Sequence, residues 1–270
     1  MITTGVSTAS FFGKVFTEEA VEHIAKMGAP VCEVFLDTFS EYEQDFVCML
    51  RERTEANDLR VQSVHAMSTQ FEPQLFSINT RQQRDARAML EKVFQAARTL
   101  GAQMYVFHGP PAFKRTLKLL NDYARLGTIV STLSDLAGEY GLRFTWENVH
   151  WCAYGHEHFA HRLLEHVQSE NLYFTLDIKQ AVLSGHTVGE YIEDMGERIA
   201  NVHLCDYFRA EDGNIYTCLP GKGELDLLWL KEALIRRGYD GSVILEVYSS
   251  NYQTFSQLHE SYKMVQEAFR

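Results

Sequence analysis

Six residues that could bind a metal ion or transfer a proton stand at or beside the ends of short apolar segments. They are His65, His108, Glu147, Asp177, His203 and Glu246. The segments are rich in β-branched and aromatic residues, which is typical of strands buried on both faces. Ionised groups in such surroundings are costly in free energy unless they are paired or bind a cation. We therefore expect chemistry at these segment ends, provided that the fold brings them together.

Eight such segments alternate with longer stretches of helical periodicity. They cover residues 2–6, 31–35, 61–65, 104–108, 143–147, 173–177, 200–204 and 243–247. Their first residues lie 27 to 43 positions apart, which is the room that a strand, a helix and two loops require. The alternation predicts a parallel sheet, and eight units favour its closure. We predict an α/β fold, a (β/α)8 TIM barrel that forms a single domain over residues 1–270.

The connecting stretches contain helix start and stop signals. Residues 80–83 (TRQQ) and 187–190 (TVGE) each match the capping-box pattern, so we expect helices to begin there. Gly101 follows the first of these periodic stretches, and glycine is the usual residue after a helix end. Further helices are expected over residues 117–140 and 156–169.

In a closed barrel of parallel strands, all the C-terminal strand ends meet at one mouth, where active sites of this fold lie. We expect Glu147, Asp177, His203 and Glu246 to bind one divalent metal ion there. Carboxylates on one apolar rim repel each other, and a cation relieves that repulsion. A set dominated by oxygen ligands favours Mn²⁺, Mg²⁺ or Co²⁺, with Zn²⁺ as an alternative.

The composition narrows the class of protein. The formal net charge of the 270-residue chain is −11, which disfavours nucleic acid as a partner because duplex-binding surfaces are usually basic. No apolar run approaches the ~20 residues that cross a bilayer, so we expect no membrane association. The five cysteines include no CxxC pair, and the N-terminus lacks a signal-peptide pattern. These features predict a cytoplasmic protein.

Five motifs, in this order and spacing, resemble those of the xylose isomerase-like TIM barrel superfamily. The motifs are FTWENV (144–149), TLDIKQA (175–181), NVHLCDYFR (201–209), LPGKGELD (219–226) and GYDGSVILEV (238–247). The resemblance covers nearly the whole chain. The superfamily includes ketose 3-epimerases, hydroxypyruvate isomerases, inosose dehydratases and DNA repair enzymes of the endonuclease IV type.

The resemblance implies roles for individual residues. In the ketose epimerase branch, the residues that match Glu147, Asp177, His203 and Glu246 bind one metal ion. The two glutamates of that branch also act as an acid/base pair on opposite faces of the sugar, which implies that Glu147 and Glu246 are catalytic. An Arg six residues after the His contacts substrate there, and Arg209 has this spacing. The implied reaction is proton transfer through an enediolate.

One position departs from the family pattern. Many members have a His three residues after the sixth-strand Asp, where this chain has Gln180. A Gln can bind a substrate oxygen but does not titrate and is a poor metal ligand. The DNA repair branch uses that His in a three-zinc cluster and places two further zinc ligands where His65 and His108 stand. Because Gln180 removes one ligand of such a cluster, we expect His65 and His108 to contact substrate instead. Glu33 and Asp206 could support the metal ligands or serve ordinary structural roles.

The sequence therefore predicts a divalent-metal-dependent isomerase or epimerase of a small sugar, sugar acid or polyol. A polyol dehydratase, which could use the same metal site, is one rival function. An endonuclease IV-like DNA repair enzyme is a second rival, and a non-catalytic carbohydrate-binding barrel is a third. The expected partner is a small carbohydrate substrate, and a homo-oligomer is compatible with the resemblance.

Overall fold

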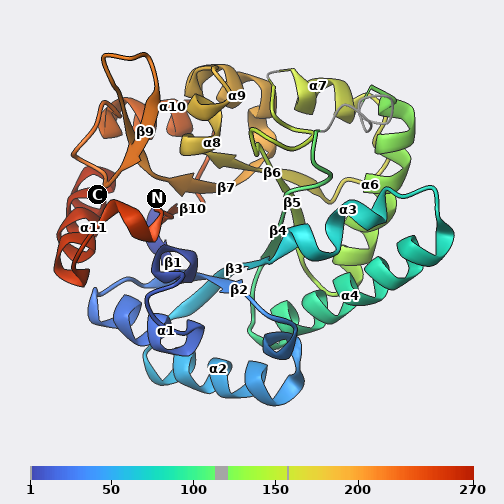
Figure 1. The fold of residues 1–270 in the computed structure, drawn as a ribbon, viewed down its shortest axis with the longest axis horizontal. Coiled ribbons are helices and arrows are strands. Elements are labelled where there is room, and N and C mark those ends of the chain that lie inside the picture. Colours follow the sequence, from blue (N-terminus) through green and yellow to red (C-terminus); the bar gives the residue numbers. More distant parts are fainter. Residues whose placement is uncertain (1, 113–120, 157) are drawn as a thin grey trace.

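A computed structural model describes residues 2–112, 121–156 and 158–270 of the chain. Its central feature is a closed barrel of eight parallel strands (Figure 1). The strands are β1 (Thr3–Ser7), β2 (Val31–Leu36), β3 (Arg60–Ala66), β4 (Met104–Phe107), β5 (Arg143–Glu147), β6 (Leu172–Asp177), β7 (Ile199–Leu204) and β10 (Ser242–Leu245). Each predicted strand lies within two residues of an observed one at both ends. The single-domain (β/α)8 TIM barrel is therefore confirmed.

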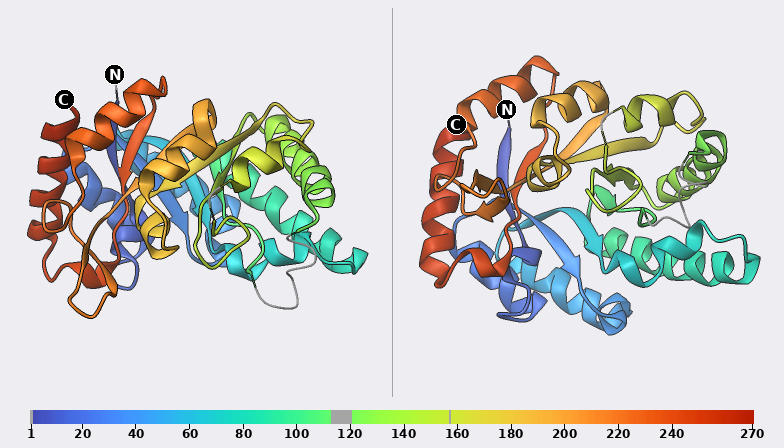
Figure 2. Two further views of the ribbon diagram at one scale, coloured as in Figure 1. Left: turned by 90° about the horizontal axis from the view of Figure 1, so that it is seen from above. Right: turned by 45° about the horizontal axis from the view of Figure 1, so that its top comes forward.

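Helices surround the barrel on its outer side (Figures 1 and 2). They are α1 (Thr17–Lys26), α2 (Gln44–Ala56), α3 (Glu72–Leu75), α4 (Thr80–Thr99), α6 (Tyr123–Glu139), α7 (Phe159–Leu164), α8 (Ile178–Leu183), α9 (Val188–Met195), α10 (Leu227–Arg236) and α11 (Phe255–Phe269). The longest of these illustrates why they pack as they do. Its buried side chains include Ala86, Leu90, Val93, Phe94 and Ala97, a spacing of three and four residues that forms one apolar stripe facing the strands.

The sequence predicted a capping box at the start of both α9 and α4, and only the one at α9 is observed. Thr187 and Glu190 form the expected capping box at the start of α9. The capping box expected at residues 80–83 is wrong, because the N-cap of α4 is Asn79, whose side chain accepts a hydrogen bond from the backbone N–H of Arg81. Asparagine is at least as good an N-cap as threonine, so the helix begins one residue earlier than the pattern suggested.

Two other predicted helices have different bounds. The helix expected over residues 156–169 is only the six-residue α7, which begins after His158 in a left-handed conformation with φ of 67°. The helix expected over residues 117–140 is observed as α6, and residues 117–120 of that prediction lie outside the described part of the chain. Within the described ranges, no helix is both long enough and apolar enough to cross a membrane.

A β-hairpin follows the seventh barrel strand and projects from the barrel, drawn in orange in Figure 1. Its strands, β8 (Asp206–Arg209) and β9 (Ile215–Cys218), are antiparallel. The Asp206 carboxylate accepts hydrogen bonds from the backbone N–H groups of Gly221, Gly223 and Leu225. This residue therefore ties the hairpin to the loop that follows it, which is a structural role and not support of a metal ligand.

Close packing inside the barrel generates a first prediction at Gly5 of β1. A Cβ atom added there would lie 2.6 Å from both the Cγ2 atom and the carbonyl oxygen of Val31. Gly5→Ala should therefore lower the free energy of unfolding by about 1–3 kcal/mol, the usual cost of overpacking. Urea denaturation measures this change.

Gly189→Ala on α9 is the matched control, because the added Cβ would meet its nearest atom, on Trp229, at 3.8 Å. Its effect should be a stabilisation of at most about 1 kcal/mol, from the better helix propensity of alanine. A Gly5→Ala protein as stable as the wild type would contradict the packing argument.

Candidate active site

The four predicted metal ligands meet around the Nδ1 atom of His203. This atom lies 3.1 Å from Glu246 Oε2, 3.7 Å from Glu147 Oε1 and 3.8 Å from Asp177 Oδ2. All four residues are buried. The barrel strands bring these residues together. Glu147 ends β5, and Asp177 ends β6 in register with His203 on β7. Glu246 directly follows β10. The strands therefore bring together residues that are far apart in the sequence.

Glu33 on β2 fixes the direction of the His203 ring. Its Oε2 atom lies 2.9 Å from His203 Nε2, and the hydroxyls of Ser7 and Ser63 donate hydrogen bonds to the same carboxylate. Burial opposes ionisation of Glu33, but His203 overcomes it and lowers the pKa of this carboxyl. With Nε2 held by Glu33, the ring presents Nδ1 to the three carboxylates, which is how metal-binding histidines are usually oriented.

The residues present fit a divalent metal ion. His203 Nδ1 and Glu246 Oε2 are buried and face each other, yet within the described ranges neither forms a hydrogen bond of good geometry. Ligand atoms of Glu147, Asp177 and His203 all lie within 4.8 Å of one another, a separation that one ion could bridge. Burial and nearby carboxylates raise the pKa of Glu246 despite opposing effects of His203 and Lys179. A divalent cation would offset the repulsion within this crowded set of oxygen atoms.

His65 and His108 extend the cluster on the side of β3 and β4. Their Nε2 atoms lie 2.7 Å apart, and His108 Nε2 lies 2.9 Å from Glu147 Oε2. Burial and His108 lower the pKa of His65 to about 3, whereas Glu147 outweighs burial and raises the pKa of His108. These two histidines and Glu147 form a further group that could hold an ion. Their predicted contact with substrate stays a prediction.

Glu72 on α3 anchors the backbone that carries His108. Its Oε2 atom accepts hydrogen bonds of 2.9 Å from the backbone N–H groups of His108 and Gly109, and Tyr105 donates to Oε1. Burial raises the pKa of Glu72 to about 7. Sequence reasoning missed this residue, because it lies in a loop-like stretch seven residues after His65 and meets its partners only in the folded barrel.

Lys179 is the other group that sequence reasoning missed. It lies in the first turn of α8 and is only 2% exposed. Its ammonium contacts Asp177 Oδ2 and lies 2.7 Å from Glu246 Oε1. Burial disfavours the charged form, but Asp177 and Glu246 raise the pKa of Lys179 well above its ordinary value. The signal available was a lysine within a short helix that is otherwise largely apolar.

Gln180 and Arg209 occupy different surroundings from the cluster of ligands. Gln180 Oε1 lies 2.5 Å from His150 Nδ1 and accepts the backbone N–H of His150, while its own backbone N–H donates to Asp177 Oδ1. Arg209 ends β8, and its side chain is exposed. The substrate-binding roles of these two residues stay predictions.

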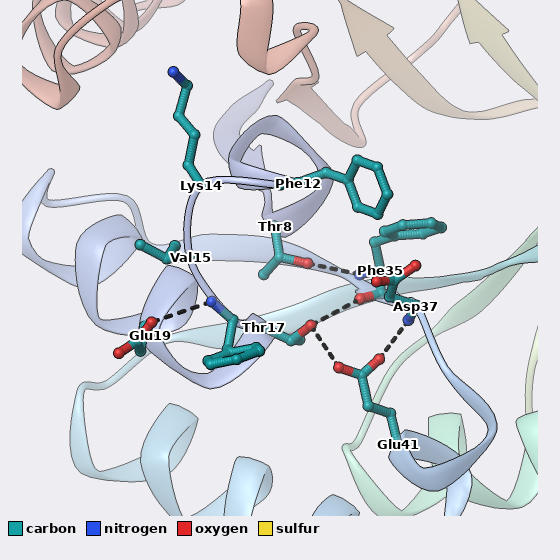
Figure 3. A pocket seen from close by; sticks show the side chains of 11 residues that line it. Thr8, Phe12, Lys14, Val15, Thr17, Glu19, Phe35, Asp37 and Glu41 are labelled. Carbon is teal, nitrogen blue, oxygen red and sulfur yellow. Dashed lines mark hydrogen bonds between the residues drawn. The ribbon is translucent and has the colours of Figure 1, made fainter.

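A cavity of about 410 Å³ opens beside the barrel mouth, between the loop after β1 and the end of β2 (Figure 3). Phe12 and Phe35 approach each other in it with ring centroids 5.9 Å apart. The ring centroid of Phe35 is also 5.1 Å from that of His65. Phe35 therefore lines the cavity and also packs against His65 beside the cluster.

Comparisons with known proteins agree with this architecture. Residues 21–269 match the family model described as "Xylose isomerase-like TIM barrel". Among solved structures, a D-tagatose 3-epimerase-like protein is 21% identical, with a TM-score of 0.78 and coverage of 99% of this chain and 98% of that chain. D-psicose 3-epimerase from Clostridium cellulolyticum H10, solved with D-tagatose, is 18% identical, with a TM-score of 0.77 and coverage of 100% and 98%. The IOLI protein, solved with a zinc atom, is 17% identical, with a TM-score of 0.80 and coverage of 99% and 98%.

The raised pKa of Glu72 predicts a pH dependence of stability. Because the folded protein binds this proton more tightly than the unfolded chain, the contribution of Glu72 is complete below the ordinary glutamate pKa of 4.5 and is lost as the pH rises through about 7. Glu72→Gln does not titrate. The stability of this variant relative to wild type should therefore increase by roughly 2 to 3 kcal/mol between pH 5 and pH 8.

Chemical denaturation at the two pH values tests this expectation, with Glu55→Gln on the surface of α2 as a control that should show no such trend. An equal stability difference between Glu72→Gln and wild type at both pH values would contradict it.

Proposed function

Because the chain belongs to the xylose isomerase-like TIM barrel family, we propose that it is a divalent-metal-dependent isomerase or epimerase of a small sugar, sugar acid or polyol. The observation that carries this proposal is the convergence of Glu147, Asp177 and Glu246 on one ring nitrogen of His203. The presence of D-psicose 3-epimerase and of a D-tagatose 3-epimerase-like protein among the similar solved structures supports the substrate class.

The proposed metal ligands are Glu147, Asp177, His203 and Glu246, with Mn²⁺, Mg²⁺ or Co²⁺ favoured by the oxygen ligands. Zinc is an alternative, and the zinc atom in the IOLI structure supports it. A bound divalent ion would polarise a sugar carbonyl and its neighbouring hydroxyl and so acidify the C–H bond beside them. The protein residues must then remove and return the proton.

Glu147 and Glu246 are suited to this proton transfer by their places around the barrel. β10 and β5, which carry them, flank β7 and β6, which carry His203 and Asp177. The two carboxylates therefore reach the same centre from different strands, one on each side of the pair formed by β7 and β6. One glutamate can take a proton from one face of a sugar carbon, giving an enediolate, and the other can return a proton to the opposite face. That sequence of transfers inverts the carbon.

The charged neighbours of each glutamate favour its ionised form and can orient the substrate. His108 lies within ion-pair distance of Glu147, and Lys179 lies within the same range of Glu246. His65, next to His108, has a lowered pKa and is suited to accept or donate a hydrogen bond as a neutral ring. Gln180 and Arg209 are the remaining candidates for contact with substrate hydroxyls.

Substitution of the acid/base pair tests the mechanism. Glu147→Gln and Glu246→Gln should each lower kcat by about 10²–10⁴-fold, the usual contribution of a positioned acid or base. Turnover would be measured on a panel of ketoses, aldoses and polyols with metal-stripped protein to which Mn²⁺, Mg²⁺, Co²⁺ or Zn²⁺ is returned. Deuterium from D₂O should enter the product at one carbon.

The exposed residue Glu211 offers the control, since Glu211→Gln removes a charge from the β8–β9 hairpin and should leave turnover unchanged. Full turnover by either Glu147→Gln or Glu246→Gln would exclude the proposed mechanism. A product that has lost water would assign the site to a dehydratase instead.

The hydrogen bond that His203 Nε2 donates to Glu33 generates a prediction about metal affinity. Glu33→Gln weakens the group that orients the His203 ring, and loss of such support typically costs 10- to 100-fold in metal affinity. Competition with a fluorescent chelator measures this loss.

Glu41→Gln is the matched control, because Glu41 follows the same strand but hydrogen-bonds Thr17 and the backbone of Thr38, outside the cluster. If Glu33→Gln and Glu41→Gln bind the ion equally well, Glu33 does not orient the metal ligand.

A further inference from the structure

Lys179 joins two of the proposed metal ligands that come from different strands. Its ammonium contacts Asp177 Oδ2 and Glu246 Oε1. The second oxygen of each carboxylate points elsewhere: Asp177 Oδ1 accepts the backbone N–H of Gln180, and Glu246 Oε2 faces His203 Nδ1. Because β7 separates the strands that carry Asp177 and Glu246, this lysine links the two sides of the site.

Apart from the nearby carboxylates, the surroundings of Lys179 disfavour a positive charge. A buried ammonium is costly unless it is fully paired. Lys179 also lies in the first turn of α8, and the N-terminus of a helix disfavours a positive charge. Neither burial nor the helix therefore explains a cation here, whereas the two carboxylates do.

Tyr248 closes the environment of this ammonium on a third side. The centroid of its ring lies 5.7 Å from Lys179 Nζ, within the range of a cation–π contact. Tyr248 is 45% exposed and follows Glu246 by two residues. The ammonium thus lies between two carboxylates and an aromatic face.

The carboxylates around Lys179 determine how this lysine would affect an incoming metal ion. Glu33, Glu147, Asp177 and Glu246 place four carboxyl groups in a small buried volume. A divalent ion and the Lys179 ammonium would both be attracted to the carboxylates of Asp177 and Glu246. The lysine therefore reduces the negative charge that an incoming ion meets, and it also keeps these two ligands together when no ion does so.

We propose that Lys179 is an internal counter-ion of the metal centre, a positioning residue that holds Asp177 and Glu246 in place and weakens the binding of the divalent ion. This inference rests on the proposed function, because it assumes that the cluster binds a metal. It goes further by assigning a residue outside the ligand set a role in metal affinity and exchange.

Metal affinity and stability of variant proteins test this inference without reference to activity. Lys179→Met and Lys179→Gln would be purified with Mn²⁺ and compared with wild type. We expect both variants to bind Mn²⁺ about 10- to 100-fold more tightly in chelator competition, because the repulsion between the ammonium and the ion is removed. We also expect a lower Tm after treatment with EDTA and a larger rise in Tm when Mn²⁺ is returned. A variant that is folded only with Mn²⁺ would also agree with the expected change in Tm.

Two further variants separate the effect of the positive charge at residue 179 from the effects of side-chain shape and of net charge. Lys179→Arg keeps the positive charge and should bind Mn²⁺ closer to wild type than Lys179→Gln does. Lys14→Met is the matched control, because Lys14 is an exposed lysine whose ammonium lies over Tyr252, and its loss changes the net charge equally. Its Mn²⁺ affinity should equal that of wild type.

The possible failures are distinguishable. Unchanged or weaker Mn²⁺ binding by Lys179→Met and Lys179→Gln would overturn the counter-ion role and leave the proposed function intact. A Lys14→Met protein with the same gain in affinity as Lys179→Met would also overturn it, because net charge would then be the cause. A wild-type protein that binds none of the four ions would overturn the proposed function, and this inference with it.

Discussion

Concentrated negative charge inside the barrel mouth is the constraint on which the rest of the site depends. Four carboxyl groups, those of Glu33, Glu147, Asp177 and Glu246, are buried around one imidazole. Like charges at such separations in a poorly solvated interior repel each other strongly. The site balances this repulsion with His203, with Lys179 and with a position suited to a divalent ion. The acid/base role proposed for the two glutamates and the proposed divalent ion thus have the same physical origin.

The fold supplies the rigidity that this balance needs. Closure of the sheet leaves every barrel strand paired on both sides, so the ligands are carried by elements that cannot move independently. The surrounding polar contacts act at the strand ends, where Glu72 holds the backbone around His108 and Asp206 holds the loop beyond the β8–β9 hairpin. Buried carboxylates therefore serve two purposes in this molecule. Some surround His203, and others accept hydrogen bonds from backbone N–H groups in the loops nearby.

The strands and the convergence of Glu147, Asp177, His203 and Glu246 could be predicted because both follow from local patterns. Apolar runs of the right length define strands, and parallel closure then places Glu147, Asp177 and Glu246 at one mouth. Lys179 and Glu72 could not be predicted in the same way. Their roles depend on the direction in which a side chain leaves a short helix and on partners 67 and 36 residues away. Local rules also failed at Asn79, where two adjacent residues could each cap the helix.

The contact between Glu33 and His203 joins residues 170 positions apart in the chain. Around the ring of strands, β2 and β7 are separated by β1 and β10 on one side and by four strands on the other. The orientation of this imidazole therefore depends on strands from both halves of the chain. A fragment that ends before β7 lacks the ring, and one that begins after β2 lacks the carboxylate that holds it.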